Sequence, residues 1–413
     1  MNLTSRFQQL TLRLGSWLAI AGALLFGLGL YIQNLAAFPS NVGVSEWWGS
    51  ELAIRYCSGF VRRGLLGQMS WLTTGWLGYQ AFYVQVLALL MAGAVLLLGF
   101  ALGIALVRRC GWRIGLLILM APVGWPVMLN HAGALFRKDA LQVILGAVLL
   151  AVWRWGWIQS VGFKKVLIGL LLASIEVLAV FNHEPFALLI LPVLAIAAFA
   201  RSRSFWQSLV LIGPGCVAFL IAAWKRGDWA QVQCLGSDLQ RLQLLLPGAL
   251  PGSSITELAL SKPSFFTWDL LPGQLFWSLV HGLVMSLAAV SAYALLMRRS
   301  GLQRAWFGAT ALWLMQCLCA MPLFLATIDY GRWFSMMFGA GLFLILICFQ
   351  RTPKEVLTFK LVGVPALSQY TLVLLEIALI PTHCCTYSAH AVFGFIPYAG
   401  LSQVKAIVAP YLT

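Results

Sequence analysis

The chain has 413 residues, of which 61% are hydrophobic and 9% are charged, and its net charge is +15. Soluble domains carry about 25% charged residues, so this composition excludes a soluble globular protein. The positive charge does not indicate a nucleic-acid partner, because the basic residues lie in short clusters between apolar runs and form no helical stripe.

A membrane-spanning helix needs about 20 mainly apolar residues, and on that rule the sequence predicts an all-α, polytopic transmembrane helical bundle of about 11 spans. The first apolar run is long for a signal peptide and no clear cleavage site follows it, so we expect it to be a retained span. A stretch near residues 66–80 is too polar and Gly-rich to count. The expected spans are residues 17–36, 81–107, 114–129, 140–158, 166–181, 186–200, 208–224, 275–297, 305–327, 334–349 and 361–380.

The distribution of basic residues predicts the orientation of these spans. With the N-terminus inside, the inner segments hold 16 of the 27 basic residues and one acidic residue, Glu355, so they carry 16 − 1 = +15. The other 11 basic and 11 acidic residues cancel. Since short cytoplasmic loops are enriched in Lys and Arg, we expect a multi-pass inner-membrane protein with a cytoplasmic N-terminus, folded as a single transmembrane domain over residues 1–413.

Two long extracytoplasmic loops follow from this topology, at residues 37–80 and 225–274. The second is rich in Pro, Gly and Ser, and we expect one short amphipathic helix in it, from Ser237 to Leu246. Four cysteines are predicted to lie outside the membrane, where two of them can form a disulfide. Their spacing alone does not determine which two would pair. These cysteines are Cys57, Cys234, Cys384 and Cys385.

The first outer loop carries two kinds of charged group. Glu46 and Glu51 flank a Trp pair, and Arg62 and Arg63 lie between two glycines. Guanidinium groups on such a turn suit a phosphate, because their donors match phosphate oxygens in pairs. The alternative is that both arginines extend to lipid headgroups. Basic pairs outside the membrane oppose the general charge trend, which favours the functional interpretation.

A second outer turn holds His131, Arg137, Lys138 and Asp139. Arg137 and Lys138 again place positive charge outside, and His131 adds a group that titrates near neutral pH. Asp139 begins the next predicted span, where its ordinary role is an N-terminal cap and partner of the helix dipole.

The remaining outer turns are tight. Pro185 disfavours helix at Glu184, so His183 and Glu184 are predicted to lie at a turn near the membrane boundary. They can act as base and orienting group, as metal ligands, or as an ordinary interfacial pair. Asp329 and Arg332 nearly fill the connection between two later spans, and a local ion pair is the simplest interpretation of them.

The layout resembles the GT-C class of integral-membrane glycosyltransferases: one span, a long first outer loop with acidic residues, then many spans. That resemblance implies a polyprenyl-phosphate-linked sugar donor and a carboxylate of the first outer loop as base, here Glu46 or Glu51. The class often shows an Asp-x-Asp or related acidic pair, where this chain has two glutamates five residues apart.

Four short segments are also similar to segments of uncharacterised bacterial multispan proteins with expected roles in envelope polysaccharide synthesis. They are Gly59–Leu65, Arg137–Asp139, His183–Glu184 and Asp329–Trp333.

We therefore expect a membrane glycosyltransferase that uses a polyprenyl-phosphate-linked sugar or saccharide at the extracytoplasmic face in envelope glycan synthesis. Its expected partners are membrane lipid, the lipid-linked donor, and a glycan or lipid acceptor, with no nucleic acid. No cofactor or metal site is predicted, and a need for a divalent metal stays open. The predicted catalytic residues are Glu46, Glu51, His183 and Glu184. The predicted substrate-binding residues are Arg62, Arg63, His131, Arg137, Lys138, Asp329 and Arg332.

Three alternatives remain. A polysaccharide polymerase or ligase would use the same outer Arg and His residues. A transporter or flippase predicts polar residues at mid-membrane, broken helices and internal repeats; Glu176 and several span prolines fit it, but the sequence shows no repeat. A non-catalytic scaffold of an envelope complex predicts that the charged turns point apart.

Overall fold

Helices make up most of the part of the chain that the structure describes, as the sequence predicts. The computed structural model describes residues 3–36, 47–129, 135–225, 227–249, 251–257, 272–302, 304–326, 330–349 and 364–379, and no β-strand occurs among them. Within that part of the chain, eight helices are long and apolar enough to cross a membrane. They are α1 (Leu3–Ala36), α4 (Tyr83–Cys110), α8 (Asp139–Ala151) with its extension η2 (Val152–Trp157), α9 (Gly162–Asn182), α12 (Phe205–Trp224), α15 (Pro272–Arg299), α16 (Ala305–Ala326) and α17 (Tyr330–Cys348).

Two predicted spans are interrupted, and a third falls only partly within the described residues. The continuous helix expected over 114–129 is wrong: α5 (Trp112–Leu119) ends, a turn follows, and α6 (Trp125–Leu129) begins afterwards. Pro122 lies in that turn, where it cannot donate a backbone hydrogen bond and disfavours helix before it. The expected span 186–200 is divided at Ile190 between α10 (Phe186–Leu189) and α11 (Leu191–Ser202), and the last one is α18 (Val364–Leu379).

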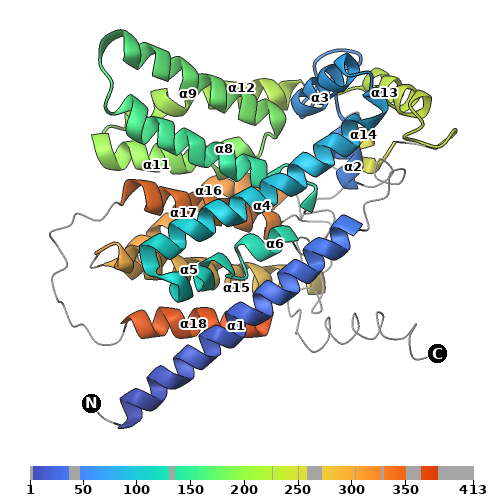
Figure 1. Cartoon of the computed structure of the whole chain (residues 1–413). Coiled ribbons are helices and arrows are strands. Elements are labelled where there is room, and N and C mark those ends of the chain that lie inside the picture. The colour runs from blue at the N-terminus through green and yellow to red at the C-terminus, as the bar shows by residue number, and fades with distance from the viewer. Residues whose placement is uncertain are drawn as a thin grey trace, which may run out of the picture.

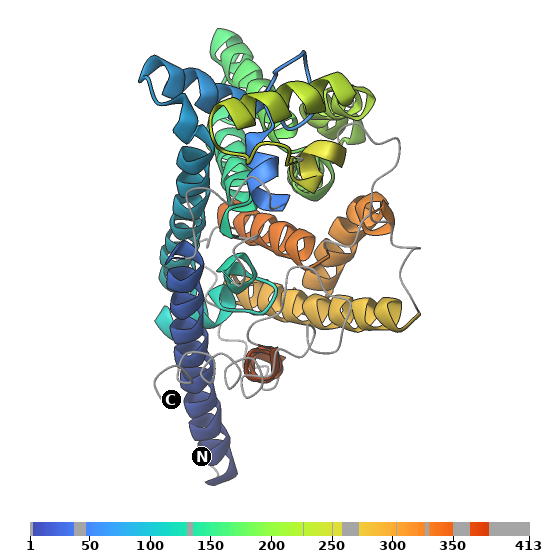
Figure 2. The same cartoon turned by 90° about the vertical axis from the view of Figure 1, so that its right-hand side faces the viewer.

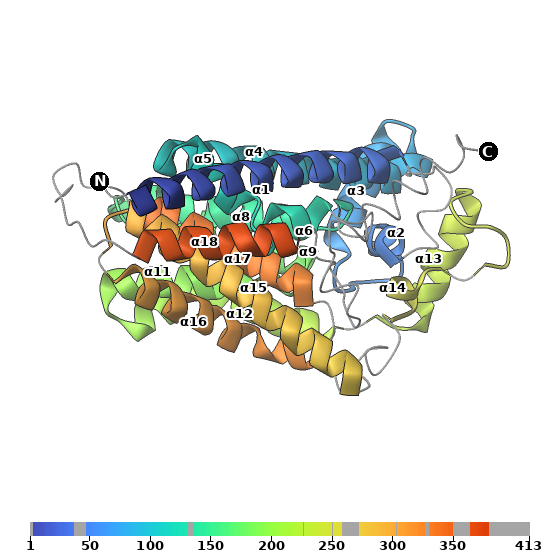
Figure 3. The same cartoon turned by 90° about the horizontal axis from the view of Figure 1, so that it is seen from below.

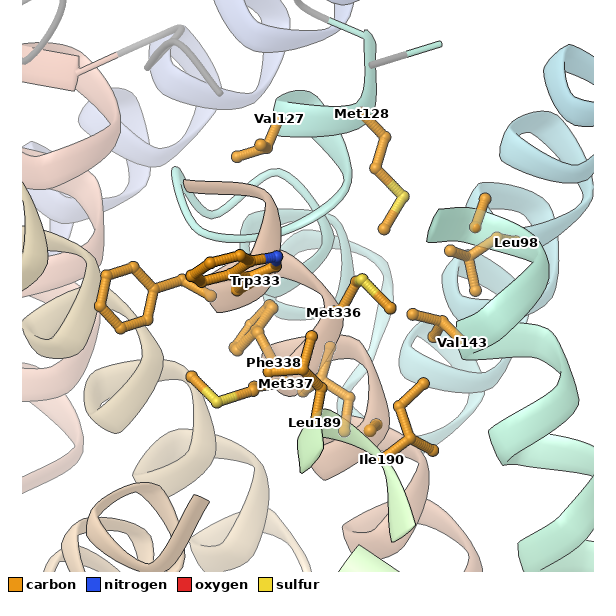
Figure 4. Close-up of a cluster of buried hydrophobic side chains, with 14 of the residues drawn as sticks. Leu98, Val127, Met128, Val143, Leu189, Ile190, Trp333, Met336, Met337 and Phe338 are labelled. Carbon is orange, nitrogen blue, oxygen red and sulfur yellow. The ribbon is translucent and has the colours of Figure 1, made fainter. Parts of the chain in front are cut away.

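Helix α17 is the centre of the bundle. The most apolar 18-residue stretch of α17 is 83% buried inside the protein, whereas the corresponding stretches of the other seven long helices are 22–56% buried. It packs on α6, α8, α11 and α15. Figure 4 shows its residues Trp333, Met336, Met337 and Phe338 among side chains of α4, α6, α8 and α10. Since the other helices keep one face outward for lipid, α17 holds the bundle together from within.

A polar contact reinforces this core. Tyr293 of α15 donates its hydroxyl to the carbonyls of Met337 and Phe338, at 3.1 and 3.0 Å, and its ring stacks on that of Phe338. Gln316 of α16 donates to the same Met337 carbonyl at 2.7 Å. Polar groups buried among helices need such partners, so these bonds fix α15 and α16 against α17.

The short helices gather at one end of the bundle, which we call the head. Figures 1 and 3 show α2, α3, α13 and α14 together there, and Figure 2 views the molecule from that side. The head consists of α2 (Trp47–Ala53), α3 (Leu65–Trp76), η1 (Gln80–Phe82), α13 (Trp229–Arg241) and α14 (Ser253–Thr256). It is therefore built from both loops that the sequence places on one side of the membrane.

The two loops are fastened to each other inside the head. Cys57 forms a disulfide with Cys234, which selects one pairing among those that the sequence left open; Cys384 and Cys385 lie outside the described residues. The side-chain oxygen of Gln231 accepts hydrogen bonds from the backbone N–H and the hydroxyl of Ser58, at 2.9 and 2.6 Å. The second loop thereby holds the chain that leads into the Arg62–Arg63 turn.

The helix expected at Ser237–Leu246 is displaced. Helix α13 begins after Asp228, whose carboxylate accepts a hydrogen bond from the Gln231 N–H at 2.8 Å. Such a side-chain cap satisfies a backbone donor that the first turn leaves open. The helix ends at Arg241, and Gln243 just beyond it adopts a positive φ of 58°, so the second half of the expected segment is a turn.

Gly67 allows α3 to lie against the backbone that leaves α2. A Cβ on Gly67 would collide with the carbonyl oxygen of Ile54, whereas a Cβ on Gly93 in α4 would meet nothing within 4 Å. We expect Gly67→Ala to destabilise the protein by roughly 1–3 kcal/mol, even though alanine is the better helix residue. Gly93→Ala is the matched control and should be neutral or stabilising by about 0.5–1 kcal/mol. Thermal unfolding in detergent measures both, and equal stabilities would contradict this packing.

Candidate functional site

Charged side chains from five segments meet where the head joins the bundle. Glu51 comes from α2, Arg62 and Arg63 from the turn before α3, and Arg332 from the first turn of α17. Other members come from the start of α8 and the turn after α9. We call this set the charged cluster: Glu51, Arg62, Arg63, Arg137, Lys138, Asp139, His183, Glu184 and Arg332.

One ion pair joins the first loop to the end of α9. The Arg63 Nε donates to both carboxylate oxygens of Glu184, at 2.9 and 2.8 Å, and the Nη1 of Arg62 lies 3.6 Å from the same carboxylate. Arg63 adopts a φ of 65°, a left-handed conformation that is uncommon outside glycine. Strained backbone of this kind persists where its surroundings determine it, often at functional sites.

A second ion pair lies deeper. The Arg332 Nε and Nη2 donate to the two carboxylate oxygens of Asp139 at 2.6 and 2.7 Å, and both side chains are almost completely buried. These two residues are 193 positions apart. Arg332 thus has an ion-pair partner far away in the sequence, while the local Asp329–Arg332 pair is not tested because Asp329 lies outside the described residues. Asp139 begins α8 and places an acid in its first turn as expected, but the cap is wrong, because Lys138 is the N-cap residue and no side-chain cap bond forms.

His183 lies between the two ion pairs. Its Nδ1 is 3.7 Å from Glu51 Oε1 and its Nε2 is 3.8 Å from Asp139 Oδ1, distances too long for hydrogen bonds. In the described part of the chain, His183 Nδ1 and Glu51 Oε1 are buried and have no hydrogen-bond partner. Such atoms are rare in folded proteins and call for an explanation, such as a ligand or a bound water.

Lys138 bridges two segments of the charged cluster. Its side chain is fully buried, and its Nζ donates to the backbone carbonyls of Arg63 and Asn182 at 3.0 and 3.4 Å. The ammonium group therefore joins the Arg63 turn to the end of α9.

The protonation states follow from burial and charge. Burial alone would raise the pKa of the Glu51 carboxyl, but the imidazole of His183 and the nearby cations lower it to about 2. The pKa of Glu184 is likewise about 2, because Arg63 and Arg62 outweigh the effect of burial. At neutral pH both carboxyls are ionised.

The pKa values of the two bases of the cluster, His183 and Lys138, are also lowered, but here burial is the cause. Burial lowers the pKa of His183 to about 4, in spite of the attraction of Glu51. Burial also lowers the pKa of Lys138, to about 8. At neutral pH the imidazole is neutral, so it can accept a proton at one nitrogen while it donates at the other.

Most of the predicted site residues converge. Eight of them belong to the charged cluster, while Glu46, His131 and Asp329 lie outside the described residues. Sequence reasoning gave no site role to Asp139 or Glu257, although Glu257 lies close enough to act on the charge of Arg63. The sequence pattern that could have indicated a role for Asp139 is an acidic residue directly after two cations at a membrane boundary. Among the described residues, no group of three or more His, Cys, Asp or Glu side chains is arranged to hold a metal ion.

Comparison with known proteins gives no family for this arrangement. No protein-family model, no curated protein and no solved structure matches the chain. The functional argument therefore depends on the geometry of the charged cluster.

The Asp139–Arg332 pair should behave as one buried unit. Asp139→Asn or Arg332→Gln alone should destabilise the protein by roughly 3–5 kcal/mol, since each leaves a buried charge unpaired. The double variant should be more stable than the sum of the single effects predicts, and a double-mutant cycle on thermal unfolding measures this coupling. Additive effects would show that the pair does not act as a unit.

His183 should make stability depend on pH in the acid range. Its pKa is about 4 in the folded protein, against an ordinary value of 6.5 for an exposed histidine, so between these values the unfolded chain binds more protons. The free energy of unfolding should therefore fall as the pH drops from about 6.5 to 4. Thermal unfolding of His183→Gln, measured over this range beside the wild type, should show a shallower slope. Identical slopes would contradict the assignment.

Proposed function

We propose that this chain is a membrane glycosyltransferase that takes a sugar or saccharide from a polyprenyl-phosphate carrier at the extracytoplasmic face and transfers it during envelope glycan synthesis. The observation that supports this most directly is the Glu51–His183 pair, whose facing atoms are buried without a hydrogen-bond partner among the described residues and are surrounded by arginines at one end of a membrane bundle. A carboxylate for proton transfer and cations for a phosphate are the two components that such a reaction needs.

Two features support an extracytoplasmic head. The Cys57–Cys234 disulfide lies within it, and disulfides persist mainly in oxidising compartments. The opposite end of the bundle carries the basic connections, including Arg108, Arg109 and Arg298, which is the pattern of cytoplasmic loops. Both features agree with an outward-facing charged cluster.

The cations of the cluster suit an anionic donor. Among the described residues, the five cations Arg62, Arg63, Arg137, Lys138 and Arg332 face the four carboxylates Glu51, Asp139, Glu184 and Glu257, a balance of 5 − 4 = +1. The most exposed of the five are Arg62 and Arg63, whose side chains are 27% and 21% exposed. Guanidinium groups bind phosphate oxygens in pairs, so this turn is where we place the carrier phosphate.

Apolar surface adjoins the same turn. The ring of Phe60 is exposed and stacks on Tyr56, and its edge contacts Phe181 near the end of α9. An amphiphilic donor needs such a boundary, with its phosphate at the arginines and its isoprenoid chain along aromatic side chains that face the membrane.

Donor binding would also activate the base. With a pKa of about 2, Glu51 is a weak base in the resting protein, because an effective general base has a pKa near the working pH. A phosphate at Arg62 and Arg63 would neutralise charge that now stabilises the carboxylate, so the pKa of Glu51 would rise. Glu51 would thus gain basicity only when the donor is present.

The proposed reaction then balances. Glu51, which lies beside His183, takes the proton of the acceptor hydroxyl. The acceptor oxygen forms a bond to the anomeric carbon as the bond from that carbon to the phosphate oxygen breaks. The lipid phosphate leaves with the electron pair and an additional negative charge, which Arg62 and Arg63 stabilise. A polysaccharide polymerase or ligase is the close variant, with a glycan chain as donor.

A transporter or flippase is the second candidate, for one observation. Glu176 of α9 is fully buried within its span, and its Oε2 accepts a hydrogen bond from the Gly215 N–H of α12 at 3.0 Å, next to Pro214. Ionisable groups within spans often mark transport pathways. We rank it second because the charged residues converge at the head and not at mid-membrane. A scaffold ranks third, since it predicts charged turns that point apart.

The test is a profile of envelope glycans and lipid-linked saccharides by mass spectrometry, in a deletion strain complemented with wild type, Glu51→Gln, Arg62→Gln or Arg241→Gln. We expect the deletion to lose a glycan and to accumulate its lipid-linked precursor on the outer leaflet. Glu51→Gln should reduce transfer roughly 100-fold or more, and Arg62→Gln should also fail to restore it. Arg241→Gln, an exposed head residue outside the cluster, should restore the glycan.

Two results would contradict the proposal that this chain is an enzyme. Restoration of the glycan by every variant at equal expression would remove the catalytic role of the cluster. Accumulation of the precursor on the inner leaflet would instead indicate transport.

A further inference from the structure

A cavity lies at the end of the bundle opposite the head. Its volume is about 650 Å³, and η2, α9, α11 and α12 form its walls. Typical ligand sites have volumes of roughly 300–1,000 Å³. We propose that this cavity binds one anionic glycerophospholipid of the adjacent leaflet, with its phosphate at the mouth and an acyl chain inside. This site is separate from the charged cluster and does not depend on the proposed transferase.

The local backbone explains why the cavity exists. The last turn of α8 continues as the π-helix Val152–Trp157, a rare distortion that often marks functional positions. It brings the ring of Trp157 against Gly169 of α9, where a Cβ would collide with it. Ala173 and Ala198 on the facing helices are small, so the walls do not close and a cleft remains.

The lining changes from polar to apolar with depth. Lys165 and Arg201 lie in the first turn of α9 and the last turn of α11, which places them at the mouth. Leu172 lies seven residues after Lys165, about 10 Å along the helix at 1.5 Å per residue. That depth is about a third of the hydrocarbon core of a bilayer. The wall at this level also includes Leu211 and Pro214, so the interior suits an acyl chain.

The charge at the mouth suits a phosphate. Lys165 and Arg201 are both cationic, and no acidic side chain is among the described residues that line the cavity. The Lys165 Nζ lies 5.0 Å from the centre of the Trp157 ring, so a cation–π contact holds it over the opening. Basic pockets between membrane helices bind lipid headgroups by such charge. An anionic lipid is therefore preferred over a zwitterionic one.

Aromatic side chains indicate the level of this mouth in the membrane. Trp155, Phe163, Phe205 and Trp206 are exposed beside it, close to the ends of the same helices. Exposed aromatic residues of this kind collect at the membrane–water interface. The cavity therefore opens where a lipid of that leaflet presents its glycerol and phosphate.

The test is native mass spectrometry of the full-length protein in detergent, with phosphatidylglycerol or phosphatidylcholine of identical acyl chains added. Wild type should retain phosphatidylglycerol preferentially. Lys165→Gln/Arg201→Gln should reduce this preference about tenfold or more, and Ala173→Phe should reduce it by filling the cleft without any change of charge. Arg299→Gln, a cation at the same end but outside the lining, should leave it unchanged.

Each other outcome has a definite meaning. If the charge variant loses the preference while a folded Ala173→Phe keeps it, the lipid binds the charged surface and not the cleft, and the proposal fails. Equal retention by all variants, or equal binding of both lipids by wild type, also overturns it. Thermal unfolding shows whether Ala173→Phe is folded, and the charge variant at the mouth tests the headgroup contact independently.

Discussion

The double hydrogen bond from Arg63 to Glu184 is the contact on which the site depends. It holds the first loop against the end of α9, and thereby keeps Glu51 at 3.7 Å from His183. The backbone of Arg63 is left-handed, which costs about 1–3 kcal/mol, and both charges are largely, though not fully, shielded from water. Such a pair is stable only with good geometry and further hydrogen bonds. The Lys138 ammonium supplies one by binding the Arg63 carbonyl.

The Asp139–Arg332 pair completes a frame around His183. Because Arg332 belongs to the central helix α17 and Asp139 opens α8, this pair connects the site directly to the core of the bundle. Substitutions in these two ion pairs would change the stability of the protein as well as its proposed activity, so the two effects need separate measurements. Glu51 and His183, by contrast, each retain a buried atom that no described residue satisfies with a hydrogen bond, which points to function more than to stability.

The two ends of the bundle differ in their electrostatics. The head mixes cations and carboxylates in a buried network and is closed by the Cys57–Cys234 disulfide. At the opposite end, the cavity between η2, α9, α11 and α12 has cations at its mouth and no acid among the described residues that line it. A network of opposite charges holds side chains in fixed positions and sets their protonation states. A cavity opening with positive charge alone attracts anionic lipid. The two proposed phosphate sites therefore differ in character.

The sequence by itself determined the helical bundle, because backbone groups within a bilayer must bond inside the same helix and long apolar runs follow from that. It also drew attention to Arg63, His183 and Glu184, because charge at a membrane boundary is costly, and these three residues lie together in the structure. Only the tertiary structure decided that Arg332 pairs with Asp139, 193 residues away, and that Cys57 pairs with Cys234. Such partners depend on how helices rotate and pack against α17, and no local pattern in the sequence encodes that arrangement.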